Sequence, residues 1–204
     1  KTLIKAKKSR NHTELLFKEL GIKTKIKKYK NFDFIEIDGG KNFKSINYSI
    51  PSDISSSSFF IALTLLSKNS SLKIKNVNVN PTRSGVISIL NLMGAKIKII
   101  NKKIYKGELV ADILVKSAKK LKGITCPSKY NANAIDEFLI IFLIASKSKG
   151  ISYFKNLSEL NKKESKRLNI ASKILNFMGV KNQLKKNSIK IYGNPNLELN
   201  TNIL

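Results

Sequence analysis

Several residue types are scarce in this sequence, and each scarcity excludes a kind of site. The 204 residues include no tryptophan, one cysteine, Cys126, and one histidine, His12. A lone cysteine cannot form a disulfide or a thiolate metal cluster within the chain, which suits a cytoplasmic protein. A lone histidine excludes a metal site built from several imidazoles. Because His12 lies beside a predicted helix cap, we expect it to form hydrogen bonds rather than to catalyse. We expect no bound metal.

Long apolar runs are also missing. The two longest, Phe59–Leu66 and Phe138–Ala145, fall far short of the roughly 20 residues that a membrane helix needs. No secretory signal pattern is present, and the sequence begins at Lys1 without an initiator methionine. We therefore expect no membrane partner, and we interpret the sequence as a piece of a longer protein. With 42% hydrophobic residues it can still bury a core, as one large or two small domains.

Acidic residues are few, and the formal net charge of +26 comes almost wholly from lysine. A nucleic-acid surface usually gathers arginine, lysine and aromatic residues on one face, whereas these lysines follow no single face of the predicted helices. Lysine, asparagine and isoleucine share A/T-rich codons, so biased base composition explains the charge best. The positive field would still concentrate small anionic substrates in a cleft. We expect no nucleic-acid partner and keep a basic nucleic-acid-binding module as an alternative.

Arginine is the scarce cation: only Arg10, Arg83 and Arg167 occur among 39 lysines and arginines. A guanidinium grips carboxylate or phosphate through a planar two-pronged fork that an ammonium cannot reproduce. The three positions are therefore candidates for binding oxyanions, although arginines also hold structural carboxylates. For Arg83 we expect a tie between neighbouring units through a carboxylate, and we assign it no catalytic role.

A short sequence motif occurs three times, at Glu19–Lys23, Leu92–Lys96 and Phe177–Lys181. In each copy a helical run ends in glycine and a strand-like stretch follows. The glycine suits a helix C-cap, which needs a left-handed backbone. A further helix and strand precede the second and third copies, so a full unit contains helix, strand, helix, strand and strand. Such repeated units predict an α/β fold with helices packed beneath sheets. The predicted helices are His12–Leu20, Ser55–Leu66, Gly85–Met93, Ala134–Ala145 and Lys163–Met178, and the predicted strands are Thr24–Tyr29, Phe34–Ile37, Leu72–Val77, Lys96–Ile100, Lys103–Tyr105, Ile151–Phe154, Gln183–Leu184 and Ser188–Tyr192.

Two groups of ionisable residues stand out. Asp136 and Glu137 open the most apolar predicted helix. An acidic pair there usually complements the helix dipole, but a carboxylate beside an apolar wall can also be tuned as a base. Lys163 and Arg167 are one turn apart on a predicted helix, with Glu164 three residues before Arg167. Such a string is usually a solvated, salt-bridged face, but two cations bracketing a carboxylate can also hold an anionic substrate while a proton moves.

Seven short motifs follow one another in one consistent order. In this order they resemble the EPSP synthase family, from Ser9 to about Gly193. The Asn-Pro-Thr-Arg motif resembles the bacterial branch of that family. The motifs are Ser-Arg-Asn-His-Thr-Glu (9–14), Pro-Ser-Asp-x-Ser-Ser (51–56), Asn-Pro-Thr-Arg-Ser-Gly (80–85), Met-Gly-Ala (93–95), Gly-Glu-Leu-Val-Ala-Asp (107–112), Ile-Asp-Glu (135–137) and Lys-Glu-Ser-Lys-Arg-Leu (163–168).

The resemblance implies a two-domain enolpyruvyl transferase architecture, with three β-α-β-α-β-β units in each domain and the active site between the domains. Residues 1–49 would end the N-terminal domain as a partial third unit, and residues 50–204 would supply two of the three units of the C-terminal domain. The implied activity transfers the enolpyruvyl group of phosphoenolpyruvate to the 5-hydroxyl of shikimate 3-phosphate, releasing phosphate, in the shikimate pathway to chorismate and the aromatic amino acids. It implies no cofactor, and a monomer at full length.

Carried over by motif, the resemblance gives roles to five residues. Asp136 would orient or deprotonate the hydroxyl, and Lys163 would contact the shikimate phosphate and the reacting oxygens. Glu164 would exchange the proton at the methylene carbon. Arg167 would clamp phosphoenolpyruvate with its fork, and Arg10 would reach the 3-phosphate.

The sequence departs from the family pattern at four positions, none of which is a proposed catalytic residue. The family commonly has Asp where Asn11 stands, Gly for Ser52, Arg for Asn161 and Asp for Lys166. The family's Lys-Ser-x-x-x-Arg, Ser-x-Gln and Asp-His-Arg segments are absent, so we expect these 204 residues alone to be inactive. A second alternative is the transferase of the same fold that acts on UDP-N-acetylglucosamine. That enzyme lacks the Lys-Glu-Ser-x-Arg arrangement and relies on a cysteine-bearing loop.

Overall fold

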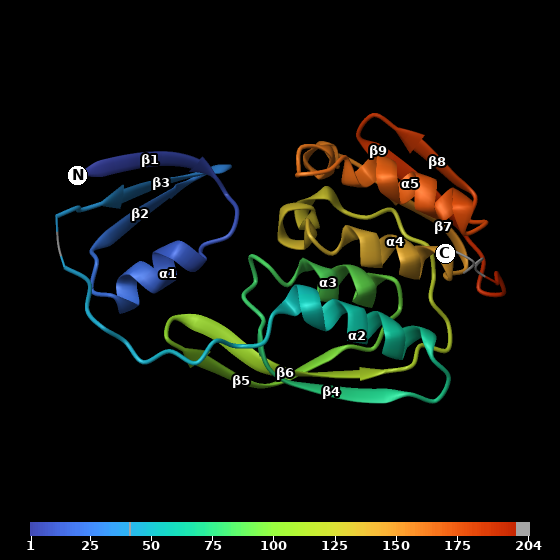
Figure 1. Ribbon diagram of the computed structural model, residues 1–204, viewed down its shortest axis with the longest axis horizontal. Helices are drawn as coiled ribbons and strands as arrows, with labels where there is room; N and C mark the ends of the chain where they lie inside the picture. The colour runs from blue at the N-terminus through green and yellow to red at the C-terminus, as the bar shows by residue number, and fades with distance from the viewer. Residues whose placement is uncertain (41, 199–204) are drawn as a thin grey trace.

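The computed structural model describes residues 1–40 and 42–198, and it arranges them as three α/β units that follow one another along the chain (Figure 1). The first unit contains β1 (Thr2–Lys7), α1 (His12–Glu19), β2 (Thr24–Tyr29) and β3 (Phe32–Ile37). The second contains α2 (Ile54–Leu66), β4 (Ser71–Asn78), α3 (Gly85–Leu92), β5 (Lys98–Tyr105) and β6 (Glu108–Lys116). The third contains α4 (Phe138–Ser146), β7 (Gly150–Phe154), α5 (Arg167–Phe177), β8 (Asn182–Lys185) and β9 (Ser188–Gly193).

Each unit has the same three-stranded antiparallel sheet. The strand orders are β1-β3-β2, β4-β6-β5 and β7-β9-β8, so the last strand of each unit is central and pairs with both others. Short segments ahead of α2 and α4 add parallel bridges, from Ser52 to Val77 and from Thr125 to Tyr153. The second and third units therefore have the order β-α-β-α-β-β, and the predicted α/β class and repeat are confirmed.

The three glycines of the repeated motif end helices as predicted. Gly21, Gly94 and Gly179 have φ angles of 79°, 97° and 77°, in the left-handed region that suits glycine. After the first of them, the N–H of Ile22 donates to the carbonyl of Phe17 at 2.9 Å, and equivalent bonds close the other two helices. This is the Schellman arrangement, which satisfies carbonyls left free at a helix end.

The sequence did not predict strands β1 and β6, and two predicted strands form a single strand, β5. The predicted pieces at 96–100 and 103–105 form the single strand β5, which continues through a bulge where Asn101 has a φ of 52°. The Asn101 amide donates to Asp112 on β6 at 2.9 Å and so holds the bulge against the sheet. Neither missed strand alternates between buried and exposed residues. Strand β6 is buried or half-buried up to Lys116, and β1 is exposed along nearly its whole length.

The predicted helix over 163–178 begins too early. The structure starts α5 at Arg167 and leaves Lys163 in a bend, so the two residues do not share one helical face. The cause is Asn161, whose side-chain oxygen accepts from the N–H groups of Leu168 and Asn169 at 3.1 and 3.4 Å. This side chain satisfies the free N–H groups of the new helix, and the chain before it is left to turn.

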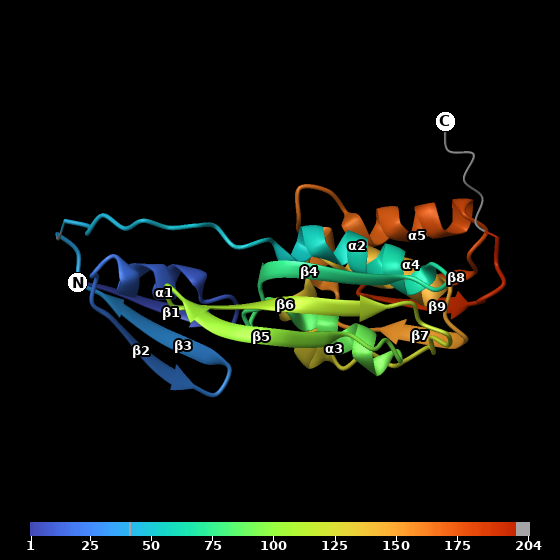
Figure 2. The same ribbon diagram turned by 90° about the horizontal axis from the view of Figure 1, so that it is seen from below.

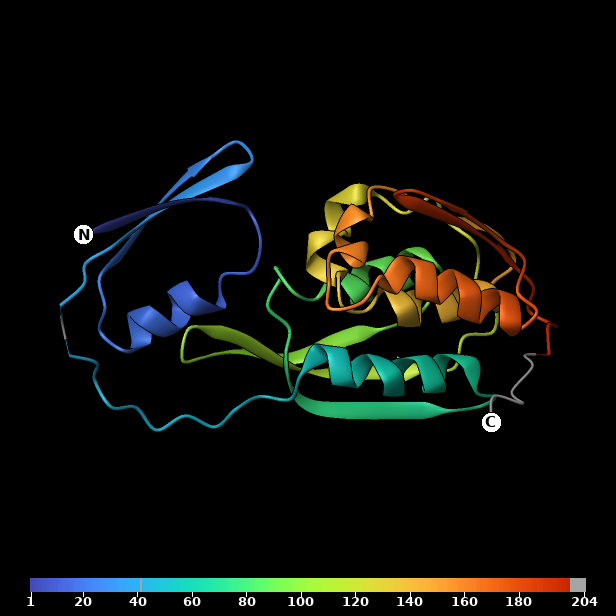
Figure 3. The same ribbon diagram turned by 45° about the horizontal axis from the view of Figure 1, so that its top comes forward.

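The core lies between the second and third sheets. Helices α2 to α5 occupy the space between these two sheets (Figures 1 and 3). At its centre the rings of Phe138, Phe142 and Phe154 pack with centroids 5.1 to 6.0 Å apart, and each residue is at most 1% exposed. Helix α4, which carries two of these rings, is apolar all round and is therefore suited to the middle of the stack.

The first unit lies beside this core rather than in it (Figures 1 and 2). Residues 42–51, which have no regular structure, lead from it to the second unit. The β5–β6 hairpin extends toward α1, and a Cβ placed on Gly107 in its turn would lie 3.5 Å from the Leu15 side chain. None of the described helices is both long and apolar enough to span a bilayer.

The aromatic cluster should dominate stability. We expect Phe138→Ala to lower the free energy of unfolding by about 3–5 kcal/mol, because it removes a buried ring and leaves a cavity. Phe59→Ala is the matched control, since Phe59 on α2 is 62% exposed. Its cost should stay within about 0.5 kcal/mol. Urea unfolding followed by circular dichroism measures both, and equal losses would contradict this description of the core.

Candidate active site

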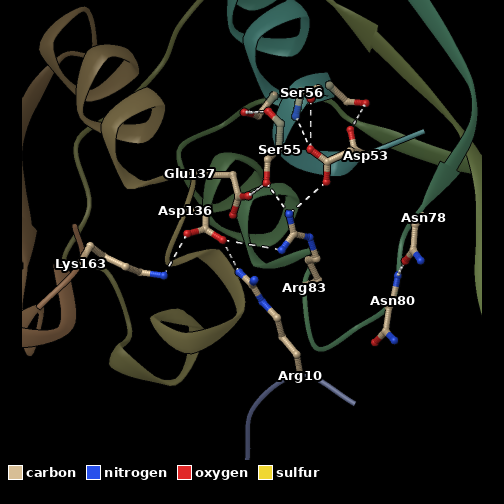
Figure 4. Close-up of polar contacts among 12 residues, drawn as sticks. Arg10, Asp53, Ser55, Ser56, Asn78, Asn80, Arg83, Asp136, Glu137 and Lys163 are labelled. Atoms are coloured by element: carbon tan, nitrogen blue, oxygen red, sulfur yellow. Dashed lines mark hydrogen bonds and ion pairs between the residues drawn. The ribbon is translucent and has the colours of Figure 1, made fainter. Parts of the chain in front are cut away.

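All three arginines of the sequence meet at one carboxylate, that of Asp136. One carboxylate oxygen, Oδ2, lies 2.5 Å from Nη2 of Arg10 and 3.6 Å from Nη1 of Arg83. The other, Oδ1, lies 3.3 Å from Nζ of Lys163 and 3.4 Å from Nη1 of Arg167. Figure 4 shows Arg10, Arg83 and Lys163 pointing at Asp136 from different sides. Four cations therefore surround a single anion.

Each of the three units supplies part of this cluster. Arg10 lies in the connection between β1 and α1, and Arg83 lies in the connection between β4 and α3. The third unit supplies Asp136 from the turn before α4, Lys163 from the bend before α5 and Arg167 as the first residue of α5. Arg10 and Asp136 are 126 residues apart in the chain. The cluster therefore exists only when the units pack together.

The electrostatics of the cluster favour an ionised Asp136 and an anionic ligand. Partial burial acts to raise the pKa of Asp136, but hydrogen bonds and charges from Arg10 and Lys163 outweigh it and hold the pKa below its ordinary value. The side chains of the four cations are 19% to 33% exposed. They are therefore shielded from bulk water yet still reachable, and they outnumber by one the three carboxylates they pair with, Asp136, Asp53 and Glu164.

Arg83 ties the second unit to the third. Its Nη2 donates to Asp53 Oδ1 at 3.0 Å and to Ser55 Oγ at 2.8 Å, while Nη1 faces Asp136. Asp53 is the N-cap of α2 and accepts the N–H of Ser56 at 2.8 Å. The predicted tie between neighbouring units through a carboxylate is confirmed, with carboxylates on both sides of the guanidinium.

Glu137 and Asp136 face opposite surroundings, although they are adjacent. The predicted helix Ala134–Ala145 begins too early: α4 begins at Phe138, Glu137 is its N-cap residue, and both carboxyls lie in the turn before it. Glu137 is 1% exposed and accepts a hydrogen bond from Ser55, while its Oε2 has no hydrogen-bond partner within the described part of the chain. Burial raises the pKa of Glu137. One carboxyl thus favours its charged form and its neighbour the neutral form.

Glu164 lies at the outer edge of the cluster. Its side chain is 73% exposed and pairs with Arg167. A backbone hydrogen bond and the bond from Arg167 lower the pKa of Glu164. The predicted association of Lys163, Glu164 and Arg167 is therefore present, but it depends on a bend and not on a helical face.

A second polar network fixes the segment that carries Arg10. Nδ1 of His12 lies 2.5 Å from Oε1 of Glu108, and Nδ2 of Asn80 donates to Glu108 Oε2 at 3.0 Å and to Asn11 Oδ1 at 2.9 Å. Burial acts to raise the pKa of Glu108, but the bonds from His12 and Asn80 outweigh it and lower the pKa. The expected hydrogen-bonding role of His12 is confirmed, with a partner in another unit.

A cleft of about 630 Å³ lies between the first and second units, with Arg83 and Asp53 on its wall. His12, Tyr48 and Glu108 also line it. Of the cluster, Arg83 lines this open space, whereas Arg10, Asp136, Lys163 and Arg167 do not. Within residues 1–40 and 42–198, no group of three His, Cys, Asp or Glu side chains is placed to hold a metal ion.

The sequence interpretation missed the supporting residues Asp53, Ser55, Asn80 and Glu108. Each lies in one of the seven motifs, so the signal was present. Asp53 caps α2, and Ser55 contacts Arg83. Asn80 and Glu108 served only to support the resemblance. Their partners lie too far along the chain for spacing to reveal them.

Comparison with known proteins gives a consistent result. The family model for EPSP synthase (3-phosphoshikimate 1-carboxyvinyltransferase) matches residues 1–202. The 3-phosphoshikimate 1-carboxyvinyltransferase of Vesicomyosocius okutanii is 40% identical over 185 residues, covering 91% of this chain and 41% of that protein. The protein of the same name from Petrotoga mobilis is 38% identical over 200 residues, covering 97% and 45%. The chain thus spans less than half the length of these relatives.

Solved structures show the same likeness. An EPSP synthase from Acinetobacter baumannii has a TM-score of 0.82 and 33% identity, covering 94% of this chain and 43% of that one. The enolpyruvyl transferase NikO from Streptomyces tendae has a TM-score of 0.63 at 12% identity, covering 94% and 42%. The second likeness shows a shared fold alone.

The two adjacent carboxyls should make opposite contributions to the pH dependence of stability. The pKa of Glu137 is raised from 4.5, so its contribution is fully present below 4.5 and is lost as pH rises through the raised value. Glu137→Gln should therefore gain stability relative to the wild type as pH rises. The pKa of Asp136 is lowered from 3.8, so its contribution is present above 3.8 and is lost as pH falls. Asp136→Asn should lose stability relative to the wild type as pH rises.

Urea unfolding of the wild type and both variants between pH 3 and pH 7 measures these trends, with all three compared at each pH. Slopes of the same sign for the two variants would contradict the assigned surroundings of the two carboxyls.

Proposed function

This chain belongs to the EPSP synthase family, and we propose that its protein transfers the enolpyruvyl group of phosphoenolpyruvate to the 5-hydroxyl of shikimate 3-phosphate, releasing phosphate. The observation that carries the proposal is the meeting of three arginines and Lys163 around Asp136. Each of the two substrates carries a phosphate and a carboxylate. A partly buried group of cations in excess over carboxylates suits such a pair of anions.

Binding would exchange internal ion pairs for substrate ion pairs. Arg167 presents a fork suited to the carboxylate or phosphate of phosphoenolpyruvate, and Arg10 reaches from the first unit toward the 3-phosphate. Lys163 lies on the opposite side of Asp136 from Arg10, near the other carboxylate oxygen. Each of these cations contacts Asp136 in the free protein, so their charges are already gathered at the site before a ligand arrives.

The proposed reaction adds and then eliminates. The 5-hydroxyl oxygen bonds to C2 of phosphoenolpyruvate and gives its proton to Asp136, while C3 gains a proton from Glu164, which takes up that proton from water once Arg167 has left it for the substrate. The adduct then loses a proton from C3 to Glu164, the bond from C2 to the phosphate oxygen breaks, and inorganic phosphate leaves with the proton that Asp136 accepted from the hydroxyl. Lys163 would stabilise the reacting oxygens. Arg167 pairs with Glu164 in the free protein, so its move to the substrate would free Glu164 to turn inward.

The activity belongs to the whole protein, because this chain spans 41% to 45% of the relatives described above. We assign residues 1–49 to one domain and residues 50–204 to a second, supported by the separate sheet of the first unit and the irregular segment 42–51. On this assignment the cluster lies where two domains meet. A cytoplasmic location and a monomeric state remain part of the same proposal.

A phosphate-release assay tests the function. The protein, purified from the complete coding frame that contains this chain, should release phosphate only when both substrates are present. Folded protein that releases none, or releases it without shikimate 3-phosphate, would overturn the proposal. If the same protein instead binds single-stranded DNA with steep salt dependence and shows no turnover, the nucleic-acid alternative would replace it.

Asp136→Asn should lower kcat about 10²- to 10⁴-fold, the usual contribution of a general base. Asp112→Asn is the matched control, because Asp112 also pairs with a lysine, Lys73, at 3.1 Å, but does so on the outer sheet of the second unit. The control should keep kcat within about twofold, since it leaves the cluster intact. Steady-state kinetics of both variants decide, and equal losses would remove Asp136 from the chemistry.

A further inference from the structure

The four cations around Asp136 differ in what else holds them. Within the described residues, the side chains of Arg10 and Lys163 have Asp136 as their one hydrogen-bonding partner. Arg167 has a second partner, Glu164, which is 73% exposed and free to turn. All three can therefore leave Asp136 without breaking a buried contact.

Arg83 cannot leave at so little cost. It donates to Asp53 at 3.0 Å and to Ser55 at 2.8 Å, and it is the least exposed of the four, at 19%. Both partners are themselves fixed: Asp53 caps α2, and Ser55 donates to the buried Glu137. Withdrawing the guanidinium would take a partner from Asp53, which is 45% exposed, and from the partly buried Ser55.

Anionic substrates should therefore draw some of the four cations away from Asp136 and leave others in place. A phosphate or carboxylate entering the cluster competes for guanidinium and ammonium groups, and the loosely held groups respond first. Asp136 would then lose the partners that keep it charged and aligned at the moment it must accept a proton. One cation is left with fixed support and with Nη1 still facing Oδ2 of Asp136, 3.6 Å away.

We propose, resting on the function above, that Arg83 is a positioning residue that holds the Asp136 carboxylate in place after Arg10, Lys163 and Arg167 have turned to the substrates. It acts through Asp136 and through the contact between the second and third units, and it does not touch the reacting atoms. The guanidinium is suited to this because its fork reaches Asp53 and Asp136 at once, which an ammonium does only in part.

The charges around Asp136 predict how the loss of Arg83 changes the pH profile of kcat. The groups that face Asp136 are the four cations, and Glu137, Asp53 and Glu164 are the nearest carboxyls. With substrates bound, Arg83→Gln removes the cation that still faces Asp136, which favours the protonated form of Asp136. The acid limb of the kcat profile should move to higher pH, because that limb reports the base in the substrate complex.

Kinetics of the complete protein form the first test. Arg83→Gln should lower kcat about 10- to 100-fold, as expected for a misplaced base, and change each KM less than about threefold. Arg83→Lys should keep the acid limb near that of the wild type and restore part of kcat. Arg167→Gln should instead raise the KM for phosphoenolpyruvate. Lys73→Gln, which removes the 3.1 Å pair with Asp112 on the outer sheet, is the control and should change neither parameter.

Two outcomes would overturn the proposal. If Arg83→Gln lowers the unfolding midpoint but leaves kcat per folded molecule and the acid limb unchanged, Arg83 is only structural. If it raises both KM values at constant kcat, Arg83 binds substrate directly.

A second measurement does not depend on turnover, so it separates this proposal from failure of the proposed function. The carboxyl carbon of Asp136 can be titrated by NMR in the complete protein, with and without inorganic phosphate. Phosphate should raise the titration midpoint of Asp136 more in Arg83→Gln than in the wild type. Equal responses would overturn the role of Arg83 even if the enzyme is active. An unequal response in a protein without turnover would support it while the transferase function fails.

Discussion

The placement of the loops around the site depends on the ionised carboxylate of Asp136, where side chains from all three units meet. Arg10 comes from the first unit, Arg83 from the second, and Lys163 and Arg167 from the third. Because a lone buried or half-buried charge is costly, each cation is stable in its place only while a carboxylate faces it. One anion thus fixes the positions of loops that no regular hydrogen-bond ladder connects.

The same arrangement is poor for stability and good for binding. Four cations pair with three carboxylates, Asp136, Asp53 and Glu164, so the cluster retains an excess positive charge that a well-paired core would not have. The cost is offset nearby: Asp53 caps α2 while pairing with Arg83, and Asn80 joins Asn11 to Glu108 across the junction of the first two units. The chain thus keeps an excess of positive charge around Asp136, where an anionic ligand can complete the pairing.

The positions of the arginines are informative because nearly all the other basic residues are lysines. Among 39 lysines and arginines, the three arginines are not scattered, and all reach the same carboxylate. A fork can bridge two oxyanions at once, as Arg83 does between Asp53 and Asp136, whereas an ammonium acts as a point charge. Scarcity of arginine therefore predicted which positions need planar, two-sided recognition, although not which carboxylate they share.

Sequence alone determined the α/β class, the repeated unit and the helix ends at Gly21, Gly94 and Gly179, because these follow from local periodicity and backbone preference. It also identified Asp136 and its cations as candidates through residue type and motif. Only the tertiary structure decided that these residues meet, that Glu137 is buried, and that α5 begins at Arg167. The physical reason is that these outcomes depend on packing between units and on contacts such as the one between Arg10 and Asp136, 126 residues apart, which local pattern does not encode.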